Sequence, residues 1–217
     1  MDIISAMKER RSVRAYSDKT VSREDIEAVI AAAGLAPSAI NLQPWEFIVS
    51  YGEEKERLVR RLKKAHAERK VSCGPGTAKP LPQKYTERSR RALAVMEPRI
   101  LQTGVSFNRF IEEGSCSFYG APVAIIVTID RVFPPIRYLD VGLGVSYLLL
   151  AAHAKGLSTC PIGLIVAYAD DIADVLNISP EKEILLGIAM GYADETAPAN
   201  DFKTGREELS EILNWYE

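Results

Sequence analysis

Cysteine and histidine are scarce in this chain of 217 residues, and their spacing excludes two classes of site. The three cysteines, Cys73, Cys116 and Cys160, are odd in number and include no C-x-x-C pair, so neither a disulfide framework nor a zinc ribbon is expected. The two histidines, His66 and His153, belong to no His or Cys grouping with ligand spacing. We therefore expect no metal site built from protein ligands and predict a cytoplasmic protein with free thiols.

Strong net charge and long apolar runs are also missing. The 27 basic and 29 acidic residues give a formal net charge of −2, which provides no general attraction for nucleic acid or for an anionic membrane. The longest apolar run, near 141–154, is short and interrupted by glycines, and the first residues do not resemble a signal peptide. We expect no nucleic-acid partner, no membrane partner and no export.

Complete nucleotide-binding loops and catalytic constellations are absent as well. The stretch 142–147 begins like a dinucleotide fingerprint, but Tyr147 stands where the third glycine belongs, and the segment lies within a helical pattern. Its small residues are instead expected to let another helix approach closely. No Ser/His/Asp, Cys/His or paired-carboxylate arrangement stands out, so no catalytic side chain is assigned.

Hydrophobic periodicity predicts an α+β domain with a small sheet flanked by helices. The expected helices cover 2–10, 22–33, 53–67, 84–96, 107–112, 140–155 and 169–176. The expected strands are a buried strand at 45–50 and two central strands at 121–129 and 184–192, with an extended stretch at 157–164. Pro98 is expected to end its helix, and the apolar helix at 140–155 to be buried on more than one side.

A compact group of cations follows the first helix, in the sequence Arg10-Arg11-Ser12-Val13-Arg14. Guanidinium groups match phosphate oxygens in pairs and stay charged at any working pH, so this segment is a candidate phosphate receptor; a solvated basic turn is the alternative. Near the other end, Lys203 and Arg206 are candidates for the same phosphate. A phosphate receptor without acid–base machinery indicates that a cofactor carries the chemistry.

Two blocks together resemble the start of the FMN-dependent nitroreductase family. The first is the arginine segment, residues 10–14, which matches R-R-S-x-R; the second is 36–47, which reads A-P-S-A-I-N-L-Q-P-W-E-F. Further similarity at 120–122, 161–163 and 187–192 extends over nearly the whole chain and is weakest at 66–118. The resemblance implies a small, mostly antiparallel sheet and an intertwined homodimer with an extended C-terminal tail, with an FMN site at each subunit interface.

The resemblance also implies roles for individual residues. The phosphate and ribityl chain would be held by Arg10, Arg11 and Ser12, with Lys203 and Arg206 closing over the phosphate. Arg14 would lie near the N1/O2 edge of the flavin ring. The residues approaching from the partner subunit would be Pro37, Ser38, Ala39 and Asn41, with Gln43 near them. One ring face would be lined by Pro161, Ile162 and Gly163, with a backbone N–H near Gly163 directed at flavin N5.

Electrons would pass from NADH or NADPH through flavin N5 to a nitroaromatic, quinone or similar small acceptor, in a ping-pong cycle. Two alternatives remain open: another flavin chemistry on the same fold, either reductive dehalogenation or flavin cleavage, and a non-catalytic FMN-binding or storage protein.

Residues 1–217 are expected to form one domain, within which 70–118 is an insert. Two glycines and three prolines at 72–82 exclude a regular element there. We predict that the insert is a mobile cover over the site, with a passive surface excursion as the alternative. Its basic residues would recognise an acidic substrate or the extra phosphate of NADPH, or merely solvate a helix. They are Lys79, Lys84, Arg88, Arg90, Arg91 and Arg99.

Overall fold

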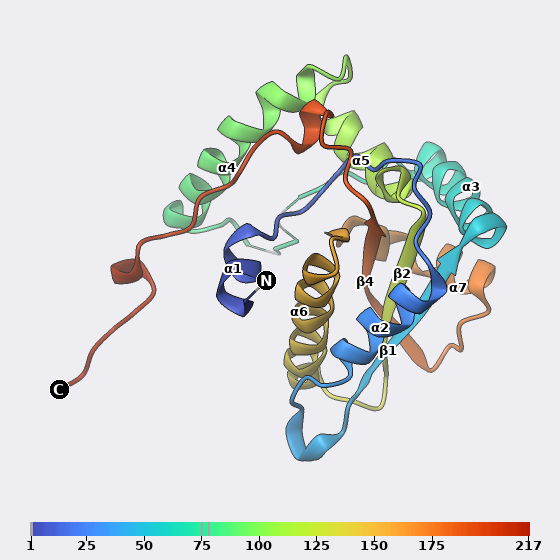
Figure 1. Ribbon diagram of the computed structural model, residues 1–217, viewed down its shortest axis with the longest axis horizontal. Helices are drawn as coiled ribbons and strands as arrows, with labels where there is room; N and C mark the ends of the chain where they lie inside the picture. The colour runs from blue at the N-terminus through green and yellow to red at the C-terminus, as the bar shows by residue number, and fades with distance from the viewer. Residues whose placement is uncertain (1, 75, 78) are drawn as a thin grey trace.

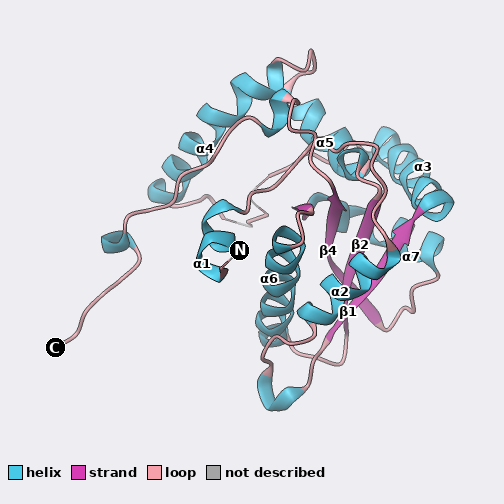
Figure 2. Ribbon diagram, in the orientation of Figure 1, coloured by secondary structure: helices cyan, strands magenta, loops and turns pink. Residues whose placement is uncertain are grey.

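The computed structural model describes residues 2–74, 76–77 and 79–217, and has the α+β architecture that the sequence predicts (Figures 1 and 2). The helices are α1 (Ile3–Glu9), α2 (Arg23–Ala33), α3 (Gly52–Arg69), α4 (Gln83–Leu101), α5 (Phe107–Cys116), α6 (Tyr138–Ala154) and α7 (Ala169–Leu176). The strands are β1 (Trp45–Tyr51), β2 (Val123–Asp130), β3 (Ser158–Ile162) and β4 (Lys182–Gly191). They form one antiparallel sheet in the order β1-β2-β4-β3.

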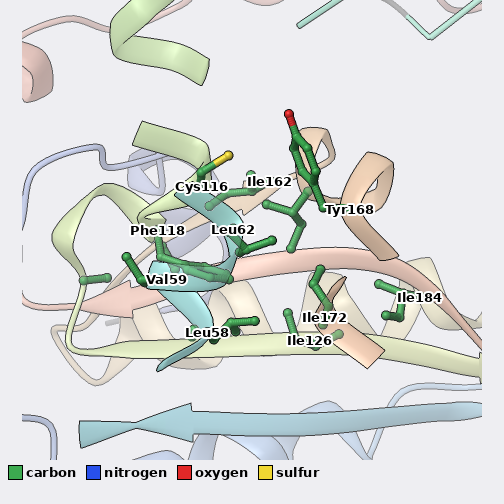
Figure 3. Close-up of a cluster of buried hydrophobic side chains, with 14 of the residues drawn as sticks. Leu58, Val59, Leu62, Cys116, Phe118, Ile126, Ile162, Tyr168, Ile172 and Ile184 are labelled. Carbon is green, nitrogen blue, oxygen red and sulfur yellow. The ribbon is translucent and has the colours of Figure 1, made fainter. Parts of the chain in front are cut away.

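The sheet separates two hydrophobic clusters, because successive side chains of β2 point to opposite faces. Ala124 and Ile126 pack with α3, α5 and α7, in the cluster that Figure 3 shows. Val123, Ile125 and Val127 pack with α2 and α6 on the other face. All five side chains are buried, which confirms that the continuous apolar run of β2 is a central strand covered on both faces.

Side-chain caps fix where the first two helices begin. The Asp2 carboxylate accepts hydrogen bonds from the backbone N–H groups of Ile4 and Ser5, so α1 begins at Ile3. The helix ends at Glu9, because the backbone of Arg10 is extended, and leads directly into the arginine segment. The Ser22 hydroxyl accepts a hydrogen bond from the Asp25 N–H and donates to its carboxylate. The predicted start of α2 is therefore confirmed.

Three local predictions were wrong. Pro98 lies inside α4 instead of ending it, because the side chains of Pro98 and Ala94 both face solvent, where water can satisfy the carbonyl that the proline cannot bond. β1 is an edge strand and only partly buried, since it pairs with β2 on one side alone. At Gly144 the close neighbour is the Trp45 indole of β1, which would lie 3.2 Å from a Cβ at this position, and not another helix.

The apolar helix α6 is buried on one side only, which corrects the expectation of burial on several sides. Its outer face exposes Leu139, Leu143 and Tyr147. The helical segment from Pro135 to Ala154, 20 residues long with mean hydropathy 1.2, also meets the length and composition of a membrane span, so the prediction of a run too short for one was wrong. A core helix meets the same test, and the inner face of α6 packs on α2 and the sheet. Its outer face still requires a cover.

We predict that Gly187→Ala destabilises the fold. A Cβ at Gly187 would lie 2.1 Å from the Ile165 side chain and 3.2 Å from the Phe118 ring, both fully buried. Overpacking of this kind costs about 1–3 kcal/mol of unfolding free energy, measurable by urea denaturation. Gly74→Ala is the control, because no atom of the described residues lies within 4 Å of its Cβ position. Equal stability of the two variants would contradict the packing described here.

Candidate anion-binding site

The arginine segment runs along the outer edge of β3. Ser12 forms a parallel bridge with Thr159, and the Val13 N–H donates to the Thr159 carbonyl at 3.0 Å. β3 can end the sheet here because Pro161, which has no N–H to donate, is tolerated in an edge strand. The strand therefore fixes the backbone from which the arginine side chains project.

The tail, residues 193–217, meets this segment directly after β4. The Ser17 N–H donates to the Tyr192 carbonyl at 2.9 Å, and the Asp194 N–H donates to the Ala15 carbonyl at 3.0 Å. The two ends of the chain thus lie side by side, as Figure 1 shows where the blue and red segments meet above β4.

Asn200 fastens the two ends together. Its Oδ1 accepts a hydrogen bond of 2.8 Å from the Arg14 N–H. Its Nδ2 donates to the carbonyls of Ala15, at 2.8 Å, and Asp194, at 2.9 Å. The side chain is buried, so these bonds are shielded from competing water. The sequence analysis missed this residue, because nothing in its immediate neighbourhood marks it.

A cavity of about 490 Å³ lies between α1, the arginine segment, α4 and the tail. Its size is within the range of small-molecule sites. Six of the predicted site residues line it: Arg10, Arg11, Ser12, Arg14, Lys203 and Arg206. The other lining residues are Ile4, Met7, Lys8, Met96, Phe202 and Thr204. Lys8 lies four residues after Ile4 and therefore on the same face of α1, so the helical pattern of the sequence could have indicated that Lys8 lines the cavity.

Most of the cations that line the cavity form no ion pair with a carboxylate of the described residues. Among the described residues, only Glu195 approaches one of its arginines, 3.8 Å from Arg11, and Arg10, Arg14 and Arg206 form no ion pair. Burial, together with the nearby Arg206 guanidinium, lowers the pKa of Arg10 from its usual range. Like charges held this close favour a bound anion.

Arg14 occupies the inner end of this group. Its guanidinium lies 5.9 Å from the centre of the Tyr119 ring, within cation–π range. Its Nε is buried and has no hydrogen-bond partner in the described part of the chain. A buried donor without a partner is costly, so Arg14 retains capacity for an acceptor that the protein itself does not supply.

Tyr119, a second residue that the sequence analysis missed, lies in a strained turn. Its φ of 53° falls in the left-handed region, and its ring packs against Gly114 of α5, where a Cβ would lie 2.4 Å from the ring. Burial raises the pKa of Tyr119 to about 12, so the phenol stays neutral beside Arg14.

The remaining predicted residues lie outside this cavity. Pro37, Ser38, Ala39, Asn41 and Gln43 belong to the exposed loop 36–44, which lies below α6 in Figure 1, away from α1. Asn41 and Gln43 have φ values of 58° and 47°, and the Ser38 hydroxyl accepts the Gln43 N–H at 2.9 Å. This loop is therefore a hydrogen-bonded, mostly exposed turn that lies outside the same-chain site.

The residues predicted for the ring face lie next to the arginine segment, at the end of β3. Pro161 and Ile162 are the last two residues of that strand, and Gly163 follows at its end. Ile162 is buried, whereas Gly163 is exposed. The parallel bridge between Ser12 and Thr159 brings this strand end to the same side of the molecule as Arg14.

Comparison with known proteins places this geometry in a family. The model of the nitroreductase family matches residues 7–192. The chain is 34% identical over 208 residues to 4-nitrobenzoate reductase of Pseudomonas putida, covering 95% of this chain and 92% of that protein. It is 36% identical over 215 residues to nitroreductase NfnB of Mycolicibacterium smegmatis, covering 96% and 90%.

A solved structure of a nitroreductase also supports the family assignment. The crystal structure of the FMN-dependent nitroreductase NfnB from Mycobacterium smegmatis in complex with NADPH superposes with a TM-score of 0.88 at 30% identity, and the match covers all of both chains. The family match spans both the arginine segment and loop 36–44, the two blocks that carried the resemblance in the sequence. The chain belongs to the nitroreductase family.

Proposed function

We propose that this protein is an FMN-dependent oxidoreductase that transfers electrons from NADH or NADPH to a nitroaromatic, quinone or similar small acceptor. The observation that carries the proposal is the cationic cavity to which both ends of the chain contribute. Bound FMN supplies the hydride chemistry, for which the protein offers no acid–base machinery of its own. Two similar proteins, a 4-nitrobenzoate reductase and an FMN-dependent nitroreductase whose crystal structure is a complex with NADPH, support this assignment.

The cavity suits the phosphate of FMN. A phosphate monoester carries up to two negative charges and accepts several charge-assisted hydrogen bonds, which Arg10, Arg11 and Ser12 can donate from one side and Lys203 and Arg206 from the other. An anion here would also relieve the repulsion between Arg10 and Arg206, which adds to burial in lowering the Arg10 pKa.

Arg14 suits the polar edge of the flavin ring. Its charge is permanent at any working pH, and its buried Nε has no partner among the described residues. A fixed positive charge beside N1 and O2 stabilises the negative charge that develops on reduction, without a proton from the protein. We propose that Pro161, Ile162 and Gly163 line one ring face, since β3 carries them beside the arginine segment.

A second copy of the chain would complete the site, and we propose a homodimer. The outer face of α6 exposes Leu139 and Leu143, and the tail exposes Trp215 and Tyr216 at 79% and 95%, so neither covers the core of its own chain. Loop 36–44 is mostly exposed and is remote from the cavity of its own chain. Contributed by the partner, Pro37, Ser38, Ala39, Asn41 and Gln43 would close the flavin site.

Three further predictions from the sequence are kept as proposals. Residues 1–217 form one domain, in which the insert 70–118 covers the site; Met96 of α4 lines the cavity, which supports a cover over a passive excursion. The protein is cytoplasmic, consistent with Cys73, Cys116 and Cys160 being free.

Anaerobic titration tests the function. We expect purified protein to carry a yellow chromophore with absorption near ~450 nm that NADH or NADPH bleaches and a nitroaromatic acceptor such as 4-nitrobenzoate restores, because flavin mediates hydride transfer in such enzymes. Bleaching that only an iodinated substrate reverses would favour reductive dehalogenation. A flavin that neither nicotinamide reduces would favour storage, and a colourless protein that FMN does not reconstitute would contradict the proposal.

Removing one of the cations proposed to bind the FMN phosphate should weaken FMN binding. We predict that Arg10→Ala and Arg206→Ala each raise the FMN dissociation constant about 10- to 100-fold, since a charge-assisted hydrogen bond contributes about 1.5–3 kcal/mol. Fluorescence quenching of FMN measures the affinity, and far-UV circular dichroism verifies the fold. Arg90→Ala, an exposed change on α4 outside the cavity, is the control. Wild-type affinity in both site variants would refute the assignment.

The proposed homodimer can be tested by its mass in solution and by a variant on the outer face of α6. Light scattering at micromolar concentration should give about twice the chain mass of 24.0 kDa. Leu143→Arg should shift the protein toward monomer and lower flavin occupancy, because it places a charge on the apolar outer face of α6. A wild-type monomer, or an L143R dimer with full flavin, would contradict this proposal.

A further inference from the structure

Basic residues of α4 are paired with acidic residues of the tail. Arg88 Nε lies 3.4 Å from Glu207 Oε2, and Arg91 donates to the other oxygen of the same carboxylate. In the last turn of the helix, Arg99 Nη1 lies 3.1 Å from Asp201 Oδ2. Figure 1 shows the tail running along α4 over this length. The insert thus contacts the tail at two points.

These two points bracket the cations of the cavity. Asp201 precedes Lys203 by two residues, and Glu207 directly follows Arg206. Between them the tail has no helix or strand that would hold it. In the part of the chain that the structure describes, the Arg206 guanidinium donates only to Thr204 and Gly205, in its own turn. The place of this guanidinium therefore depends on where the tail lies.

Glu207 is the stronger of the two anchors. An isolated surface ion pair stabilises little, but one carboxylate shared by two guanidinium groups forms a network. The side chains of Glu207 and Arg88 are each only 26% exposed, so solvent screens this pair less than a fully exposed one. The hydrogen bond from Arg91 and the charge of Arg88 keep the pKa of Glu207 below its usual range, so the carboxylate is ionised at neutral pH.

We propose that α4 acts as a strap on the tail, in which Arg88 and Arg91, through Glu207, position Lys203 and Arg206 over the cavity. The strap rests on the proposed function, because the ligand that Lys203 and Arg206 would bind is the phosphate of FMN. Arg88, Arg91 and Glu207 are positioning residues and do not line the cavity. Two basic residues of the insert, Arg88 and Arg91, thus bind the tail of their own chain. Recognition of an acidic substrate or of the NADPH phosphate was the alternative role.

The strap predicts linkage between tail order and phosphate binding. If the tail is docked for only a fraction of the time, the apparent dissociation constant rises by the inverse of that fraction. Binding of FMN must in turn favour the docked tail, because coupling between two equilibria is reciprocal. Riboflavin, which lacks the phosphate, would not sense the position of Lys203 or Arg206.

The test compares Glu207→Gln with Glu208→Gln on the full-length protein. Glu208 is the neighbouring carboxylate and forms no ion pair with any residue in the described ranges. We expect E207Q to raise the FMN dissociation constant about 3- to 10-fold at low salt, as for the loss of one or two networked surface pairs, with riboflavin binding unchanged. The difference should shrink near about 0.5 M NaCl, and E208Q should behave as wild type.

Two further measurements separate positioning from general damage to the fold. Glu207→Asp retains the charge and should recover most of the FMN affinity, and Arg91→Ala should have a smaller effect in the E207Q background than alone. In FMN-free protein, E207Q should speed hydrogen exchange of residues 202–207 without changing the exchange of β2 and β4.

The outcomes are distinguishable. E207Q with wild-type FMN affinity and wild-type exchange in the tail overturns the strap and leaves the proposed function intact. Equal weakening of FMN and riboflavin also overturns it, because the effect would then not act through the phosphate. Wild-type protein that binds neither flavin overturns the FMN assignment itself, and with it the role given to Glu207.

Discussion

The site depends on holding like charges close together. Arg10 and Arg206 come from opposite ends of the chain, and burial together with the nearby Arg206 charge lowers the Arg10 pKa. The fold holds this arrangement with neutral and acidic groups placed outside the cavity: Asn200 bonds the backbone on both sides, and Glu207 holds the tail. A ligand that binds only this folded arrangement stabilises it in turn, so an anion here supports both the binding site and the fold.

Local patterns in the sequence predicted the elements well where a short stretch determines its own structure. The Ser22/Asp25 cap, the helical face of α2 and the apolar run of β2 each contain their signal within about ten residues. The errors arose where the surroundings decide. Pro98 continues a helix because its neighbours face water, and β1 is half exposed because no strand follows it in the sheet of one chain.

The residues of the candidate site show the same contrast between those that a local motif marks and those whose role depends on distant contacts. The motif of the arginine segment marked Arg10, Arg11, Ser12 and Arg14, and these four residues line one cavity together with Lys203 and Arg206 from the other end of the chain. Asn200 and Tyr119 were missed because their roles depend on contacts with residues far away in the sequence, the Arg14 N–H and the Arg14 guanidinium. The pairing of Glu207 with Arg88 and Arg91 joins positions more than a hundred residues apart, for which no periodicity exists. The sequence alone left three roles open for those arginines: recognition of an acidic substrate, recognition of the NADPH phosphate, or solvation of a helix.

The bond between Arg14 and Asn200 spans 186 positions. A nascent polypeptide emerges from the ribosome amino end first, so residues 10–14 are exposed long before their counterpart at 200 has been translated. The pocket can close only after synthesis is nearly finished, and a prematurely terminated product cannot form it. The prosthetic group can therefore be acquired only late in synthesis, and its presence marks a polypeptide that extends at least to residue 206.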